Sequence, residues 1–154
     1  MFYNNSYIWD VSNLYIDFDE IGSHACQNMF AACSNLHTPP HMETATKYDE
    51  YSCAWMFNGS ALTGTTPINP SGTVDKYAFI AFYGGSNQQI VNADYVLPSN
   101  CNLSGGSFAF SFENNSMLKR GPIIGGNNVL GPAIYGNEYP YWRFYYGCSS
   151  LSAI

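Results

Sequence analysis

Two cysteines and three histidines fall within residues 23–43, SHACQNMFAACSNLHTPPHME, in a chain with few ionisable groups. Thiols and imidazoles held together can bind a metal or pair as nucleophile and base, and thiols alone can form disulfide bonds. Which chemistry is open to them depends on the element that positions them.

The segment has the spacing of an amphipathic helix. Ser23 is a suitable N-cap, and Pro39 and Pro40 end the run. The apolar residues between them recur at helical intervals: Ala25, Cys26, Met29, Phe30, Cys33 and Leu36. We therefore expect one short helix over about residues 24–35.

On such a helix Cys26 and Cys33 lie two turns apart, about 10 Å along the axis. That separation exceeds the ~4 Å between two thiolates on one zinc ion and the ~7 Å limit between bridged Cα atoms. Each helical cysteine would then pair, if oxidised, with Cys53, Cys101 or Cys148. We predict that the thiols are structural, with a bridge between Cys101 and Cys148. Because the chain has five cysteines, one of them is left unpaired.

The histidines offer weaker leads to chemistry. His37 and His41 have the spacing of a helical metal pair, but the two prolines between them forbid a helix. An extended loop could still bring His37, His41 and Glu43 onto one ion. His24 could sit beside Cys26, yet no residue marks a third orienting group. We predict no functionally required metal and no cofactor, and the sequence has no GxSxG elbow, P-loop or HExxH motif. The chain is therefore predicted not to be an enzyme.

The composition favours a mainly β fold. Only 10% of residues are charged and 17% are aromatic, so the surface must consist largely of Asn, Ser, Thr, Gly and Tyr. Short aromatic runs such as SFAFSF (107–112) alternate with Gly, Pro and Asn-rich turns. We expect a single domain, 1–154, built as an antiparallel sandwich, barrel or knob with the short helix packed on it.

The charge pattern excludes some partners. The net charge is −6, and the five basic residues form no stripe that would attract nucleic acid or an anionic membrane. No apolar run approaches the roughly 20 residues that insert across a bilayer. The low charge and the five cysteines favour an extracellular location or a virion or cell-surface appendage.

Polar-tipped aromatic residues gather near the C-terminal end, where Asn, Glu and Arg supply hydrogen-bonding groups. Such rings give large contact areas for few frozen torsions, which suits ligand recognition. The candidate binding residues are Tyr135, Asn137, Glu138, Tyr139, Tyr141, Arg143 and Tyr145. Alternation along 141–146 would turn Trp142, Phe144 and Tyr146 into the core and leave Tyr141, Arg143 and Tyr145 outside. The alternative is that the whole segment is core.

Three functions remain open. The first is a receptor-binding or adhesin module of a larger assembly, such as a phage tail-fibre tip or a pilus tip, that recognises a cell-surface glycan or protein. The second is a structural subunit of a virion or surface filament, forming a homo-oligomer or part of a larger assembly. The third is a small secreted hydrolase with an unseen metal or carboxylate site.

Overall fold

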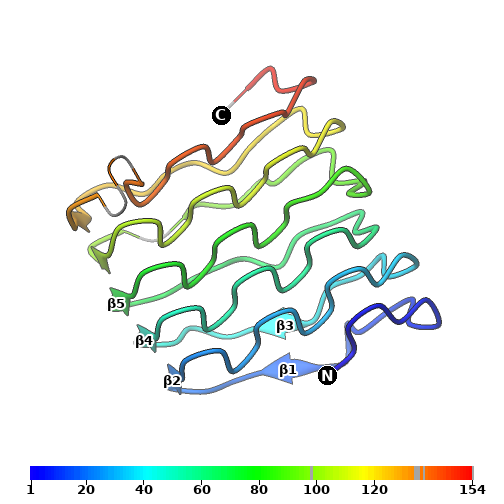
Figure 1. Ribbon diagram of the computed structural model, residues 1–154, viewed down its shortest axis with the longest axis horizontal. Helices are drawn as coiled ribbons and strands as arrows, with labels where there is room; N and C mark the ends of the chain where they lie inside the picture. The colour runs from blue at the N-terminus through cyan, green and yellow to red at the C-terminus, as the bar shows by residue number, and fades with distance from the viewer. Residues whose placement is uncertain (98, 134–135, 137, 154) are drawn as a thin grey trace.

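The chain winds into a stack of parallel coils, a β-solenoid (Figure 1). The computed structural model describes residues 1–97, 99–133, 136 and 138–153. Each coil has a wall of short extended segments and a zigzag wall of consecutive turns. We call the second the turn wall; it comprises residues 23–33, 50–60, 76–85, 105–115 and 140–148.

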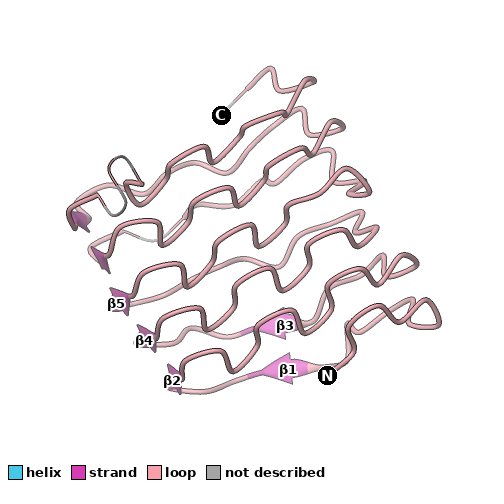
Figure 2. Ribbon diagram, viewed as in Figure 1, coloured by secondary structure: helices cyan, strands magenta, loops and turns pink. Residues whose placement is uncertain are grey.

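The extended segments hold seven two-residue strands, which Figure 2 sets apart from the turns. They are β1 (Tyr15–Ile16), β2 (Glu20–Ile21), β3 (His41–Met42), β4 (Lys47–Tyr48), β5 (Thr73–Val74), β6 (Asn102–Leu103) and β7 (Val129–Leu130). β1 pairs with β3, and the other five form one sheet in the order β2-β4-β5-β6-β7.

Every one of these strand pairs is parallel, so the antiparallel sandwich, barrel or knob expected from the sequence is wrong. The register places Glu20 beside Lys47, and Lys47 beside Thr73, so each strand's partner follows only after a complete coil. A tight hairpin joins antiparallel strands, whereas parallel neighbours require a long connection. Here the turn wall and its return segment provide that connection.

The turn wall divides its backbone hydrogen bonds between two directions. The N–H of Cys26 donates to Ser52 in the next coil at 2.7 Å, while the N–H of Gln27 donates back to His24 at 3.3 Å. The same alternation continues with Asn28, which donates to Ala54 at 3.0 Å. Tandem turns thus satisfy half of the donors locally, and the neighbouring coil satisfies the rest.

The helix expected over residues 24–35 is absent, because this segment forms turn wall. A left-handed backbone conformation recurs every fourth residue, with φ of 59° at His24, 54° at Asn28 and 56° at Ala32. Inward-pointing side chains recur at the same four-residue interval, as Cys26 and Phe30 do. A repeat of four resembles the 3.6-residue period of a helix, so the apolar spacing alone does not separate the two.

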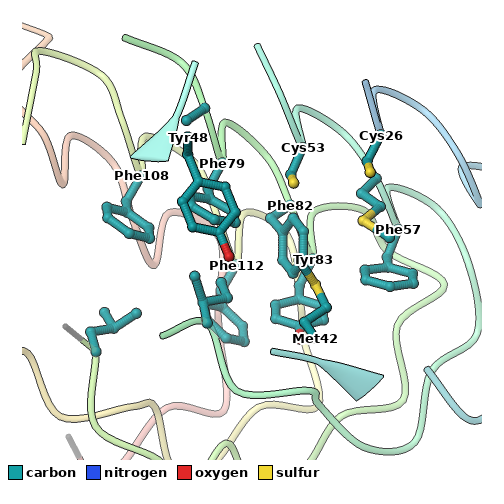
Figure 3. Packing of buried hydrophobic residues seen from close by; sticks show 14 of the residues in the cluster. Cys26, Met42, Tyr48, Cys53, Phe57, Phe79, Phe82, Tyr83, Phe108 and Phe112 are labelled. Carbon is teal, nitrogen blue, oxygen red and sulfur yellow. The ribbon is translucent and has the colours of Figure 1, made fainter. Parts of the chain in front are cut away.

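Side chains at equivalent positions of successive coils stack into columns that fill the interior (Figure 3). In one column each ring centroid lies 5.2–6.1 Å from the next; its members are Phe2, Phe30, Phe57, Tyr83, Phe112 and Tyr145. A second column contains Cys26, Cys53, Phe79, Phe108 and Tyr141. The spacing of the rings follows from the spacing of parallel strands, about 4.8 Å. Stacking of the coils therefore brings the rings into contact, and contact between the rings stabilises the stack.

Candidate recognition face

The left-handed positions of the turn wall lie away from the interior columns, and most of them are at least partly exposed, although Tyr77 and Ala81 are buried. The first row of these positions holds His24, Tyr51, Tyr77 and Gly106, and Tyr139, just before the last range of the turn wall, continues their register in the last coil. His24 stacks on Tyr51 with ring centroids 5.2 Å apart, and Tyr51 stacks on Tyr77 at 5.1 Å. We call the outer surface of the turn wall the turn face.

A second row of left-handed positions lies four residues further along each coil. It holds Asn28, Trp55, Ala81, Phe110 and Arg143. Trp55 is half-buried and stacks on Tyr51 of the first row at 5.9 Å. The Arg143 guanidinium lies 5.8 Å from the ring of Phe110 and 4.2 Å from that of Tyr146. A cation over aromatic rings is attracted to their electron-rich faces, which holds this exposed arginine in place.

A hollow adjoins the first aromatic row at the corner between the two walls. Its volume is about 340 Å³, and it is lined by Glu50, Asp75, Lys76, Ser104, Gly105, Gly131 and Pro132. Lys76 forms an ion pair with Glu50 at 3.0 Å, and the Ser104 hydroxyl donates to Asp75 at 3.3 Å. Hydrogen-bonding groups of both kinds therefore line a surface hollow next to stacked aromatic rings.

The candidate binding residues of the C-terminal segment divide between the two sides of the turn wall. Tyr139 and Arg143 are exposed on the turn face. Glu138 is half-buried, and its carboxylate accepts a hydrogen bond from the Tyr77 hydroxyl. Tyr135 and Asn137 lie outside the described residues.

Tyr141 and Tyr145 instead belong to the interior columns, contrary to the alternation considered for 141–146. The ring of Tyr141 stacks on Phe108 at 5.5 Å, and burial raises the pKa of its hydroxyl to about 12. Tyr145 donates to the Pro122 carbonyl at 2.9 Å, and burial also raises its pKa. The four-residue period of the turn wall places 141 and 145 inward and 143 outward, which a two-residue strand period cannot do.

The turn face also includes residues that sequence reasoning missed: His24, Tyr51, Trp55, Phe110, Trp142 and Tyr146. Trp142 packs edge-on against Phe110 with centroids 4.8 Å apart. The signal that would have found these residues is the repeat of about 27 residues, in which Met29–Phe30 recurs as Met56–Phe57.

The histidines of the 23–43 segment do not converge. His37 lies 3.0 Å from the Ala61 carbonyl through Nδ1, and the ring of His41 stacks on Tyr15 at 4.8 Å. His24 is on the turn face, whereas the neighbouring Cys26 is buried in the core. Within the described part of the chain, no three His, Cys, Asp or Glu residues are grouped to hold a metal ion.

All five cysteines are unpaired, and each lies in the described part of the chain. Three thiols donate to carbonyls: Cys33 to Phe2 at 3.0 Å, Cys101 to Pro70 at 3.2 Å and Cys148 to Phe112 at 2.9 Å. Cys101 and Cys148 therefore have separate partners and do not form the expected bridge. Cys26 and Cys53 are neighbours in one interior column.

Comparisons with known proteins give no relatives: no family model, no curated protein and no solved structure matches this chain. Across the residues that the structure describes, no helix has the length and apolar character needed to cross a membrane.

Proposed function

We propose that the chain is a non-enzymatic recognition module whose binding surface is the turn face. One observation carries the proposal: the turn face displays partly exposed aromatic side chains at positions in register on several coils, among them Tyr51, Trp55 and Tyr139. Tyr51 adjoins Glu50, which lines the hollow with Asp75 and Lys76, and Trp55 and Tyr139 supply further aromatic surface on the turn face. Aromatic rings next to paired donors and acceptors suit a sugar ring, which has apolar faces and hydroxyl edges.

The ligand is a cell-surface glycan or protein, and the hollow favours a glycan. The carboxylates of Glu50 and Asp75 accept hydrogen bonds, which sugar hydroxyls can donate. The coil stack supports this role because its interior columns hold the backbone rigid while outward side chains vary. The module acts outside the cell or on a virion or surface appendage, as part of a larger assembly.

The decisive experiment compares two tyrosines that differ in position but not in chemistry. Tyr139 is 58% exposed on the turn face, and Tyr7 is 91% exposed in the N-terminal segment. We expect Tyr139→Ala to weaken binding on a glycan array or to target cells at least tenfold, about 1.4 kcal/mol, with an unchanged melting temperature. Tyr7→Ala should bind as the unmodified chain does.

Enzymatic treatment of the target cells identifies the class of ligand. Binding lost after glycosidase treatment assigns the ligand to glycan, and binding lost only after protease treatment assigns it to protein. Normal binding by both Tyr139→Ala and Trp55→Ala would contradict the proposal that the turn face recognises the ligand.

A structural subunit of a virion or filament is the second candidate, and one observation favours it. β7 is one of the two edge strands of its sheet, and both its residues are exposed, Val129 by 64% and Leu130 by 58%. Unpaired strand edges with exposed apolar side chains favour association with another chain. Light scattering over a range of protein concentrations distinguishes the two: a growing mass without any receptor supports the structural role, and a constant monomer mass contradicts it.

A further inference from the structure

Cys26 and Cys53 occupy equivalent positions in adjacent coils. The Cys26 N–H donates to the Ser52 carbonyl and the Asn28 N–H donates to the Ala54 carbonyl, so Cys53 lies between these two acceptors, in register with Cys26. Parallel neighbours in register have Cα atoms about 4.8 Å apart. Disulfide-bonded cysteines have Cα atoms about 4.4 to 6.8 Å apart, so the backbone spacing suits a bond.

Both side chains point into the core, where Figure 3 shows them side by side. Cys26 is 5% exposed and Cys53 is fully buried. A hydrogen bond between the two thiols lowers the pKa of Cys26, whereas burial raises that of Cys53. Cys26, the less buried of the two, is therefore the thiol that an oxidant reaches first.

The other three cysteines have no such neighbour. The thiols of Cys33, Cys101 and Cys148 donate to three different carbonyls. In the following coils, the column of Cys26 and Cys53 continues with Phe79 and Phe108. A bond between Cys26 and Cys53 therefore competes with no other thiol pairing in this column.

We propose that Cys26 and Cys53 form a disulfide that joins the first two coils when a low-molecular-weight disulfide, such as glutathione disulfide, serves as oxidant. The Cys26 thiolate attacks one sulfur of the oxidant, forms a mixed disulfide and releases one small thiolate. Cys53 then loses its proton and attacks the Cys26 sulfur, which releases the second small thiol. Two protein thiols are oxidised to one disulfide, and one small disulfide is reduced to two thiols.

The test uses the complete chain. The protein is incubated with glutathione disulfide, remaining thiols are alkylated in denaturant, and unreduced peptides are analysed by mass spectrometry. We expect one cross-link, between the peptides of Cys26 and Cys53, with the other three cysteines alkylated. Dithiothreitol should remove the cross-link and lower the melting temperature of the oxidised protein.

Two variants sharpen the result. Cys101→Ser should keep the cross-link, whereas Cys53→Ser should stop the reaction at a glutathione adduct on Cys26. Three outcomes in the unmodified chain would overturn the proposal: alkylation of both Cys26 and Cys53, a cross-link between another pair, or a persistent glutathione adduct on Cys26 without a cross-link.

Discussion

Ala31 and Ala32 provide a direct test of the turn wall, because adjacent alanines there have opposite backbone requirements. Ala32 has φ of 56°, and its equivalents in the later coils also have positive φ: Gly59, Gly85, Asn114 and Gly147. Ala31 is not among the positive-φ residues and is only 4% exposed. We expect Ala32→Gly to stabilise the fold and Ala31→Gly to destabilise it.

The expected difference follows from three contributions. The left-handed conformation costs a non-glycine residue roughly 1–2 kcal/mol, which Ala32→Gly relieves. Glycine loses more backbone entropy on folding, at a cost of about 0.5–1 kcal/mol. Ala32→Gly should therefore gain about 0.5 kcal/mol, whereas Ala31→Gly loses that entropy and about 0.8 kcal/mol of methyl burial. The two variants should differ by about 2 kcal/mol.

Thermal melts followed by circular dichroism measure this difference. For a chain of this size, 1 kcal/mol shifts the melting temperature by about 2–4 °C, so the variants should melt about 4–8 °C apart. In a helix over 24–35, each glycine would cost about 1 kcal/mol and the two melting temperatures would nearly coincide. Equal destabilisation by both substitutions would therefore refute the turn wall in this segment.

Two further predictions concern the inward tyrosines of the last coil. Tyr141→Phe should leave stability unchanged or slightly higher, because the Tyr141 hydroxyl is buried without a hydrogen-bond partner. Tyr145→Phe should instead lower the free energy of unfolding by about 1 kcal/mol, because it removes the hydrogen bond to Pro122. Urea denaturation of both variants measures these changes. Stability should also fall at alkaline pH. Burial raises the Tyr141 pKa from 10.0 to about 12. The contribution of neutral Tyr141 to the stability of the fold is therefore complete below pH 10 and is lost as the pH rises towards 12. Tyrosine difference absorbance and circular dichroism should record ionisation and unfolding together. Tyrosine ionisation that is complete near pH 10 in the folded protein would contradict this prediction.

The sequence predicted the wrong elements because the turn wall repeats every four residues, and neither the helix period of 3.6 residues nor the strand period of two describes it. The spacing of the apolar residues predicts a helix over about 24–35, and the aromatic run at 107–112 predicts a strand. In the structure Phe108 and Phe112 are buried, while Phe110 is half-buried at a left-handed position. A four-residue unit with one left-handed residue accounts for both segments, and neither the helix nor the strand period describes it.

The parallel topology depends on contacts that are distant in the sequence. Two-residue strands such as β4 (Lys47–Tyr48) carry no alternation that a local pattern could reveal. The sequence repeat indicates the topology instead: Cys26, Met29 and Phe30 recur at Cys53, Met56 and Phe57, 27 positions later. Later coils replace these residues with other aromatic and aliphatic ones, so the repeat weakens along the chain.

Only part of the candidate site could be predicted from the sequence, because the side chains that share a face are set by the four-residue repeat and by coil stacking. Composition located hydrogen-bonding aromatic residues near the C-terminal end, and the structure places Tyr139 and Arg143 on the turn face. It places Tyr141 and Tyr145 in the core, because inward positions recur every four residues. The place of Tyr51 and Trp55 on the turn face was not predictable from their own segment. Only the stacking of coils brings them beside residues that are distant in the sequence.

The turn wall separates the demands of folding from those of recognition. Its inward positions, such as Phe57 and Tyr83, are fully buried and stack on the coils on either side, so their size is constrained. Its left-handed positions must tolerate positive φ, but most of them are at least partly exposed, and their residues range from Asn28 to Trp55 to Arg143. Substitutions at the exposed positions of these rows therefore alter the surface chemistry at little cost to the core. A surface that can change while its backbone stays fixed is what a recognition module requires, which is why the turn face carries the proposed function.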